Sequence, residues 1–411
     1  MQNNKTRIVV VGGGTGGMAA VSALDQLPGR DKLDITLLEP SEYHYYQPQW
    51  TMVGAGLFPR EVTRRPMAEL VPEGINWINE GCAEFVPHDN HLLTVSGRRI
   101  DYDYLIVATG LKLDWDKIDG LKGNLGKHGI CSNYSYDSVP STWENIRNLK
   151  HGVAMFTFPP PPIKCAGAPQ KIMYLAEDHF RRSGVRNQVT VSYRCAGDSI
   201  FAVKKYAAAL NEICAKRSID TQFAWKLKAV DAVAHEANFE HTKSGETRTE
   251  KYEMLHITPQ MSAPQVVSSS PLANEAGFVE VDKGTLQHTR YPNVFSLGDS
   301  SSCPTSKTAA AVRAQLPVLI FNLVATMNGR ALGEKYDGYT SCPLVTGYGR
   351  LILAEFDYEL NPQETFPFDQ GKERLSMYLL KKYILPYIYW KGLIAGRKWP
   401  WLMPESHLKA F

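Results

Sequence analysis

Apolar residues in the first forty positions form two short runs separated by a segment with helical periodicity. The first run, Arg7 to Val11, is rich in β-branched residues, and the second, Asp34 to Leu38, is similarly apolar. Runs of this length are typical of buried strands in a parallel sheet. The alanine- and leucine-containing segment from Met18 to Leu27 predicts a helix between them. The pattern therefore predicts a strand–helix–strand unit of an α/β fold.

A glycine-rich sequence joins the first predicted strand to the helix. Residues 12–17 read Gly-Gly-Gly-Thr-Gly-Gly and fit GxGxxG, the pattern that binds a dinucleotide pyrophosphate at a helix N-terminus. We expect Gly12 to allow the tight turn, Gly14 to admit the pyrophosphate, and Gly17 to let helix and strand pack closely. Gly16 completes the loop. Glu39 ends the second strand, 22 residues after Gly17, where an acid accepts ribose hydroxyls and favours FAD or NAD over NADP.

Two later segments favour FAD. Residues 104–110 read as a strand that ends in Ala-Thr-Gly, and residues 291–299 as a strand that ends in Gly-Asp. Each alone is equally compatible with a buried strand and a turn, but their order is that of two-dinucleotide flavoproteins, in which the Asp binds the flavin ribitol. Residues 306–311 then predict a capped helix whose positive end suits a reduced flavin. The candidate FAD residues here are Gly110, Asp299, Lys307 and Thr308.

The middle of the chain lacks the second glycine loop that would bind NAD(P)H. A strand is predicted over Gly152–Phe158, and a helical stretch over Lys171–Arg182, but four prolines at 159–162 and then Cys165 stand between them. Proline has no N–H and a fixed φ, so this loop cannot cradle a pyrophosphate. The strand–loop–helix frame therefore holds a cysteine where a phosphate is expected. We infer that electrons arrive at a thiol and not from a nicotinamide.

Several long motifs resemble sulfide:quinone oxidoreductases, particularly the mitochondrial type and its bacterial relatives. They are IKCAGAPQKIM at 163–173, YTSCPLVT at 339–346, EPSEYHYYQP at 39–48, PTSKTAAA at 304–311 and FPFDQGKERLSM at 366–377. The resemblance covers nearly the whole chain. It implies redox-active cysteines at Cys165 and Cys342, FAD contacts at Gln47 and over Lys307–Ala310, and a backbone contact to adenine near Cys82.

The resemblance also implies a reaction. Hydrogen sulfide attacks a Cys165–Cys342 disulfide, or a pair bridged by extra sulfur, and we expect the persulfide on Cys342. The outer sulfur passes to an acceptor such as sulfite, a thiol or cyanide, or grows into a polysulfide. Electrons pass through FAD to a quinone. Cys131 occupies a position where the mitochondrial-type sequences look like they have glycine. It is therefore either a third sulfur-handling thiol or a small buried residue.

The C-terminal segment from Arg374 to Pro404 combines six basic residues and seven Tyr or Trp residues with no acid. Prolines at 386 and 400 interrupt it, which favours helices that lie in a membrane surface over a spanning helix. A dimer interface or a helical hairpin over the core is the alternative. Phe368, Tyr383 and Tyr387 are candidates to line a quinone pocket. We expect a peripheral, monotopic protein of a bacterial or mitochondrial inner membrane.

Composition narrows the remaining possibilities. The net charge of +3 over 411 residues gives no reason to expect nucleic acid as a partner. Seven cysteines without regular spacing argue against a secreted disulfide scaffold, and we expect no metal site. The apolar run begins within a few residues of Met1, so no targeting segment is expected in this sequence: either the protein needs none or the sequence begins at a mature end. The oligomeric state, the quinone type and the covalency of FAD stay open.

The expected architecture is α/β, with two Rossmann-like domains of the glutathione-reductase type and a C-terminal amphipathic helical region that binds a membrane. The predicted FAD domain is split over 1–115 and 285–340, the second domain spans 116–284 and carries Cys165, and the region 341–411 carries Cys342. Three alternatives remain: a flavocytochrome-type sulfide dehydrogenase flavoprotein, a type II NADH:quinone oxidoreductase, and a non-catalytic flavin-binding redox sensor.

Overall fold

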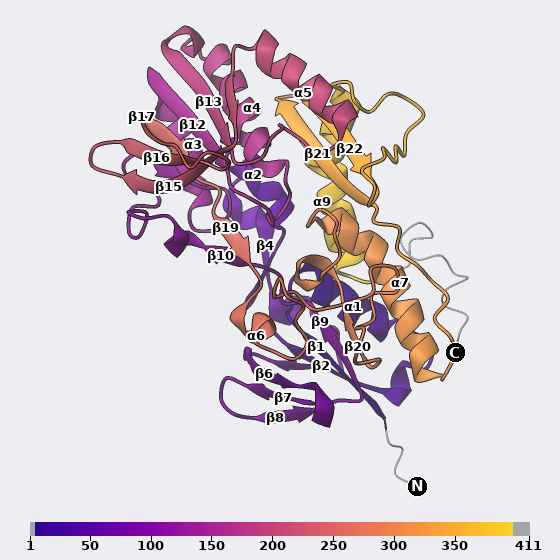
Figure 1. The fold of residues 1–411 in the computed structure, drawn as a ribbon. Helices are drawn as coiled ribbons and strands as arrows, with labels where there is room; N and C mark the ends of the chain where they lie inside the picture. Colours follow the sequence, from indigo (N-terminus) through magenta and orange to yellow (C-terminus); the bar gives the residue numbers. More distant parts are fainter. Residues whose placement is uncertain (1–4, 398–411) are drawn as a thin grey trace.

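The lower lobe in Figure 1 is built on a five-stranded parallel sheet with the order β20-β9-β1-β2-β5. The computed structural model describes residues 5–397 of the 411-residue chain. Helices α1 and α7 pack against each other beside this sheet. The bounds are β1 (Thr6–Val11), β2 (Leu33–Leu38), β5 (Asn76–Ile78), β9 (Tyr104–Val107), β20 (Val294–Ser296), α1 (Thr15–Asp25) and α7 (Ala309–Met327).

The upper lobe holds a second five-stranded parallel sheet, ordered β11-β18-β12-β13-β14, with a three-stranded antiparallel sheet β15-β16-β17 beside it. The parallel strands are β11 (Ile130–Cys131), β12 (Gly152–Phe158), β13 (Val189–Cys195), β14 (Asp220–Phe223) and β18 (Met254–His256). The antiparallel strands are β15 (Trp225–Asp231), β16 (Glu236–His241) and β17 (Thr247–Lys251). The helices are α3 (Val139–Asn148), α4 (Ala168–Arg182) and α5 (Lys204–Lys216).

Smaller elements complete the fold. A β-hairpin, β21 (Thr340–Gly347) with β22 (Arg350–Phe356), packs on α4. Pairs β3–β4 and β10–β19 and the sheet β6-β7-β8 are all antiparallel. Their bounds are β3 (Tyr43–Tyr45), β4 (Arg64–Pro66), β6 (Cys82–Val86), β7 (His91–Thr94), β8 (Arg99–Asp101), β10 (Lys112–Asp114) and β19 (Gln260–Ser262), and the short helices are α2 (Trp50–Val53) and α6 (Gln265–Ser268).

The predicted elements are confirmed with small shifts at their ends. Strand β12 has the predicted bounds, while α4 starts three residues earlier than expected, at Ala168. Proline suits the first turn of a helix, so Pro169 belongs inside α4. The strand expected over 104–110 ends at Val107, and Gly110 beyond it has φ +73°. The chain thus has the α/β fold with two Rossmann-like sheets that its sequence predicts.

By length and composition, helix α7 could cross a membrane. It is the one helix within residues 5–397 that meets this criterion. Eleven of its nineteen residues are buried, and it packs on α1. The stretch is not free of charge, because Arg313 lies within it. Its burial identifies α7 as a core helix of the lower lobe.

The C-terminal segment forms one helical rod where separate helices broken at Pro386 were expected. It consists of α8 (Leu375–Leu379), a π-helical turn (Leu380–Ile384), α9 (Leu385–Ile388) and a second π-helical turn (Tyr389–Leu393). Pro386 lies in the first turn of α9, directly after a π-turn, where its missing N–H is tolerated. The basic and aromatic residues Lys398, Trp399 and Trp401, and Pro400, lie outside the described residues.

The aromatic residues of this rod do not all face outward. Tyr378, Tyr389 and Trp390 are buried in the protein. The exposed apolar side chains are spaced at helical intervals and form one stripe, which we name the outer stripe: Leu375, Leu379, Tyr383, Ile384 and Tyr387. The rod is therefore amphipathic, with its buried face holding part of the predicted aromatic set.

Candidate active site

The two cysteines singled out by sequence lie side by side although 177 residues separate them. The Sγ atoms of Cys165 and Cys342 are 3.5 Å apart, and both thiols are free. Cys165 lies in the loop between β12 and α4, and Cys342 lies on β21. The hairpin β21–β22 packs on α4 and so brings Cys342 to the proline-containing loop. The pair is within the distance at which small movements form a disulfide.

Gly167 makes the approach of the second thiol possible. A Cβ atom at Gly167 would lie 2.5 Å from the Sγ of Cys342 and 2.4 Å from Cδ2 of Leu344. No side chain other than hydrogen fits between the loop and the hairpin at this point. The glycine of the CAGAP motif is therefore required by the geometry of the cysteine pair.

The loop around Cys165 is held in an unusual backbone conformation. Cys165 has φ +51°, which non-glycine residues rarely adopt and which clusters at functional sites. Its N–H donates to the carbonyl of Lys307 over 2.9 Å, and its carbonyl accepts the N–H of Ala168 over 2.8 Å. The first contact ties the loop to the segment before α7, and the second places the cysteine at the start of α4.

The surroundings of Cys165 favour its thiolate. The pKa of Cys165 lies well below its usual value, because the thiol of Cys342 donates to it and because the Lys171 ammonium is close. Lys171 Nζ lies 3.1 Å from the Cys165 sulfur, and Lys171 is buried. The pKa of Cys342 is raised by the same hydrogen bond and by burial. The N-terminus of α4 adds a partial positive charge beside Cys165.

Two further buried groups face the cysteine pair. Lys381, on the first π-turn of the C-terminal rod, donates from Nζ to the carbonyl of Pro48 over 2.9 Å. Burial and the neighbouring Lys171 lower the pKa of Lys381 to about 7, while both cysteines oppose this. Tyr134 is buried beside the pair and donates to the carbonyl of Lys164 over 3.2 Å. The pair therefore has two lysines and a phenol around it.

The predicted dinucleotide loop has the geometry that the pattern requires. Gly12 has φ +100°, and a Cβ there would lie 2.4 Å from the carbonyl of Ala108. A Cβ at Gly17 would overlap the carbonyl of Gly12, while a Cβ at Gly16 would lie 3.3 Å from Cγ of Leu297, which is tighter than an ordinary contact. At Gly14 a Cβ would meet no atom within 4 Å, so open space lies above the N-terminus of α1. The loop fits a pyrophosphate at that point.

The carboxylate predicted to bind ribose lies at the end of β2 with its oxygens held by backbone groups. Glu39 Oε2 accepts the N–H of Gly13 over 2.5 Å, and Oε1 accepts the N–H of Ser41 over 2.7 Å. Burial raises the pKa of Glu39, and these two hydrogen bonds oppose the rise. The segment before Cys82 joins this site, because Asn79 donates to the carbonyl of Glu39 over 3.3 Å.

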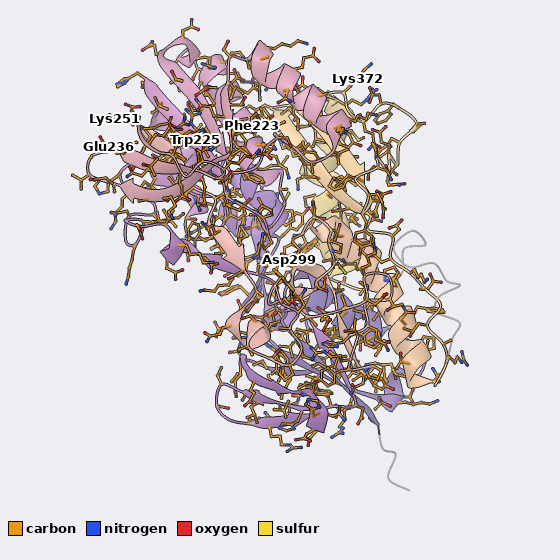
Figure 2. All side chains as sticks on the ribbon, viewed as in Figure 1. Phe223, Trp225, Glu236, Lys251, Asp299 and Lys372 are labelled. Carbon is orange, nitrogen blue, oxygen red and sulfur yellow. The ribbon has the colours of Figure 1, made fainter. Side chains whose placement is uncertain are left out.

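The remaining predicted FAD residues gather between the two lobes. Figure 2 places Asp299 at their junction. Burial raises the pKa of Asp299, while Lys164 and Lys307 lower it. Lys164 Nζ lies 3.3 Å from Oε1 of Gln47, so this lysine links the carboxylate, the amide and the cysteine loop. At Gly110 a Cβ would again meet nothing within 4 Å.

The predicted helix start after residue 306 is confirmed. Thr308 caps α7 by accepting the N–H of Ala311 over 3.0 Å. Lys307 Nζ donates to the carbonyl of Ser301 over 2.7 Å and lies over the ring of Phe278. The segment thus places Lys307 and Thr308 at the positive N-terminal end of α7.

Sequence reasoning missed the lysines around the thiols, since the site is assembled from distant segments. Lys171 offered a signal, because it follows Cys165 by six residues in a predicted helix. Lys381 offered no signal, because the expected role of its segment was a membrane surface.

Cys131 is fully buried, and burial raises its pKa to about 12. Such a thiol behaves as a small apolar residue, which is one of the two roles predicted for Cys131.

A cavity of about 460 Å³ borders the cysteine loop and the segment before α7. Ile163 and Ala166 line it on one side, and Ser302, Ser306 and Lys307 line it on the other. Within residues 5–397 no group of three or more His, Cys, Asp and Glu side chains is arranged to hold a metal ion.

Comparison with known proteins gives concordant results. Residues 6–140 match the pyridine nucleotide-disulphide oxidoreductase family. The chain is 49% identical over 396 residues to the mitochondrial sulfide:quinone oxidoreductase of Dictyostelium discoideum, covering 96% of this chain and 87% of that protein. It is 48% identical to the Mus musculus protein of the same name, with the same coverage.

A solved structure has the same fold. The sulfide:quinone oxidoreductase of Aquifex aeolicus matches with a TM-score of 0.79 and 22% identity, covering 95% of this chain and 92% of that chain. At this identity the likeness concerns the fold, while the closer sequence relatives identify the family.

Proposed function

Because the chain belongs to the sulfide:quinone oxidoreductase family, we propose that Cys165 and Cys342 are the pair at which it oxidises hydrogen sulfide. The chain is an enzyme that oxidises sulfide with a quinone as electron acceptor, and its cofactor is FAD. Type II NADH:quinone oxidoreductases match over only 30% of the chain, so that alternative is not favoured, and neither is the flavocytochrome type.

The observation that carries the proposal is the 3.5 Å contact between two thiols of unequal acidity. Hydrosulfide attacks the Cys342 sulfur of the oxidised pair, a bond forms between the two, and the Cys165–Cys342 bond breaks. Cys342 then bears a persulfide, and Cys165 departs as a thiolate. A thiol of lower pKa is the better leaving group, and Lys171 stabilises the charge that it acquires.

The separation also accommodates a bridging sulfur. Two S–S bonds of about 2.05 Å reach up to about 4.1 Å, so one sulfur atom fits between sulfurs at the observed distance. In either form of the pair, a nucleophilic acceptor takes the outer sulfur of the persulfide and leaves Cys342 as a thiolate. Bound FAD supplies the two-electron redox chemistry that links the reduced pair to the quinone. The FAD contacts we propose are the residues predicted from the sequence.

The sulfur acceptor belongs to the same proposal. Sulfite, a thiolate and cyanide are all anionic nucleophiles, and the buried Lys171 provides positive charge beside the pair, to which Lys381 adds in its protonated form. The cavity along Ile163 and Ala166 gives a route to the loop from solvent. We expect the acceptor to enter there.

Membrane docking is a further part of the proposal. Relatives named mitochondrial support association with a mitochondrial membrane. We propose a monotopic attachment through the outer stripe, whose side chains Leu379, Tyr383, Ile384 and Tyr387 are 43% to 56% exposed. Basic residues flank the stripe, and cations beside an apolar face suit an anionic bilayer surface. The predicted split FAD domain, second domain and C-terminal region remain our proposed division of the chain.

Anaerobic titration of the purified protein with sulfide tests the central claim. Sulfide alone should bleach the flavin absorbance, and a soluble quinone added afterwards should restore it. A flavin that stays oxidised with excess sulfide contradicts the assignment. A flavin that bleaches but is not reoxidised by quinone contradicts the acceptor.

A further inference from the structure

The last turns of the C-terminal rod contact the glycine-rich loop directly. The Tyr389 hydroxyl lies 2.9 Å from Oγ1 of Thr15 and 2.6 Å from Nε2 of His44. Nδ1 of His44 lies 2.8 Å from the carbonyl oxygen of Gly13. Tyr389 and His44 are both buried. A helix near the C-terminus, the loop after β1 and strand β3 therefore meet in one network away from water.

Chemistry fixes the direction of each hydrogen bond in this network. The Gly13 carbonyl can only accept, so Nδ1 of His44 carries a proton and donates it. Burial lowers the pKa of His44 to about 4, so its ring is neutral and Nε2 accepts from the Tyr389 hydroxyl. The Tyr389 oxygen then accepts from Thr15. Thr15 therefore donates to Tyr389, Tyr389 donates to His44, and His44 donates to Gly13. No other arrangement is possible while the histidine is neutral.

Other contacts fasten the same two parts of the chain. The Gly13 N–H donates to Glu39, so both polar backbone groups of Gly13 are held. Further along the rod, the Ser22 hydroxyl donates to the carbonyl of Ile394 over 2.6 Å. Gly396 has φ +61°, and a Cβ there would lie 2.7 Å from the carbonyl of Ser22. The end of the rod is thus closely fitted to α1, the helix whose N-terminus is the dinucleotide site.

We propose that Tyr389 is a positioning residue for FAD: through Thr15 and His44 it holds the glycine-rich loop in the conformation that binds the pyrophosphate. The inference rests on the FAD binding given under the proposed function and extends the cofactor site to the C-terminal rod. The same rod carries the outer stripe, so one element serves both the membrane and the cofactor.

Release of FAD tests the proposal without sulfide, quinone or membrane. Tyr389→Phe keeps the ring on Tyr46 and Trp390 but removes the hydroxyl. The holoenzyme is diluted into buffer without FAD, and released flavin is followed by fluorescence. We expect release roughly tenfold faster than from the wild type, since a buried acceptor loses its donor. Tyr378→Phe is the matched control, because Tyr378 is buried on the same rod but packs on the β21–β22 cluster, and it should release FAD at the wild-type rate.

Two further comparisons separate the hydroxyl network from general loosening of the rod. His44→Asn keeps a donor for the Gly13 carbonyl but has no atom in place of Nε2, so Tyr389→Phe should add little in that background. At the other end, Thr15→Ser should retain FAD, while Thr15→Val should release it faster. These Thr15 variants decide the matter if Tyr389→Phe does not fold.

Three results would overturn the proposal: wild-type release from Tyr389→Phe, equal acceleration in Tyr378→Phe, or fully additive effects in the His44→Asn background. Because no substrate is present, such a result leaves sulfide oxidation untouched. Failure of the sulfide titration would in turn leave the FAD-release comparison valid.

Discussion

The acidity of the Cys165 thiol has several sources that converge on one sulfur atom. The Cys342 thiol donates to it, the Lys171 ammonium lies 3.1 Å away, and the N-terminus of α4 adds a partial positive charge. Cys342 has its pKa raised by the same contact and by burial. The two thiols therefore take different roles, with Cys165 as the leaving group and Cys342 as the site of attack.

The first prediction concerns the pair itself. Cys165→Ser and Cys342→Ser should each abolish sulfide-driven quinone reduction while the protein keeps its FAD, because residues that act as a unit lose nearly all activity on either change. Cys131→Ser is the matched control and should retain more activity, since that thiol is fully buried. Steady-state turnover and flavin content are measured on the same samples. Wild-type turnover by Cys342→Ser would contradict the pair mechanism.

A second prediction tests the electrostatic role of Lys171. Lys171→Met keeps the length of the side chain but removes the charge that lowers the pKa of Cys165. The pKa of Cys165 should rise, so the thiolate forms only at higher pH. The pH profile of flavin reduction by sulfide should therefore shift toward alkaline pH, with the largest loss on the acid side. Lys391→Met, an exposed position on the second π-turn, should leave the profile in place. An unshifted profile in Lys171→Met would refute the assignment.

At the scale of elements, the sequence was sufficient wherever a segment's structure is decided by its own pattern. The GxGxxG loop, β12 and the cap of α7 by Thr308 were predictable, since glycine spacing, β-branched runs and capping residues act locally. For the C-terminal rod, the amphipathic character was predictable, but the residues on its buried face were not. Its composition indicates an amphipathic helix, but Tyr389 and Trp390 are buried because they meet β3 and the glycine loop, segments more than 340 residues away.

The outer stripe supports a third prediction. Substituting the stripe tests it better than truncating the tail, because truncation would also remove the buried face of the rod. Removing the chain from Arg374 onward would also remove Tyr389 from the glycine-rich loop and Ile394 from α1. A variant with Leu379, Tyr383, Ile384 and Tyr387 changed to Ser removes most of the apolar area of the outer stripe and keeps the buried Tyr389 in place. Its affinity for liposomes should fall roughly a thousandfold, because each of the four partly exposed side chains contributes about 1 kcal/mol on burial and every 1.4 kcal/mol is about tenfold. FAD content should be unchanged.

Sedimentation with liposomes in high salt measures this loss, since salt screens charge and leaves apolar burial. Val95→Ser and Val233→Ser are the control, because both valines are exposed and lie elsewhere on the surface. Equal sedimentation of the wild type and the stripe variant at both low and high salt would count against docking through the stripe. The stripe would then be better explained as an interface between copies of the chain.

The whole molecule combines two sheets that the sequence predicts with a site that it predicts only in part. Local patterns predicted four strands of the first sheet, β1, β2, β9 and β20, but only β12 of the second. The thiol site brings together the loop after β12, the hairpin β21–β22 and the C-terminal rod, which supply Cys165, Cys342 and Lys381. The resemblance to a known family identified the two cysteines. The position of Lys381 depends on packing between distant segments, so it could not be predicted from a local sequence pattern.

A fourth prediction follows from the second sheet. The prolines at 159–162 follow β12, the position where a glycine loop would have to bind NADH. NADH should therefore fail to bleach the flavin in anaerobic stopped-flow measurements, while sulfide bleaches it under the same conditions. Rapid bleaching by NADH would mean that a nicotinamide site exists outside this loop.

A fifth prediction concerns stability in acid. Burial lowers the pKa of His44 to about 4 and that of His256 to about 3, while the unfolded chain has ordinary histidines. Between pH 6.5 and 4 the unfolded state therefore binds more protons, and the free energy of unfolding should fall as pH falls. Each histidine contributes about 1.4 kcal/mol per pH unit in this window. Buried carboxyls such as Glu39, with a raised pKa, act in the opposite direction.

The contribution of one histidine is isolated by His256→Gln, whose amide oxygen can replace Nε2 as the acceptor for the N–H of Asn133. Denaturant unfolding at pH 7 and pH 5 should show a smaller loss for this variant than for the wild type. An equal loss in both proteins would mean that His256 titrates normally in the folded state.

The two π-helical turns of the C-terminal rod have a consequence for how this tail tolerates changes in length. A π-turn holds one residue more than an α-turn, so it absorbs a single inserted residue while the helix on either side keeps its facing. Deleting one residue from the turn Leu380–Ile384 would restore an α-turn and leave Tyr389 at Thr15. Deleting Ser376 from α8 would instead rotate one part of the rod against the other by about 100°. Homologous tails should therefore differ in length by one residue at these turns and nowhere else along the rod.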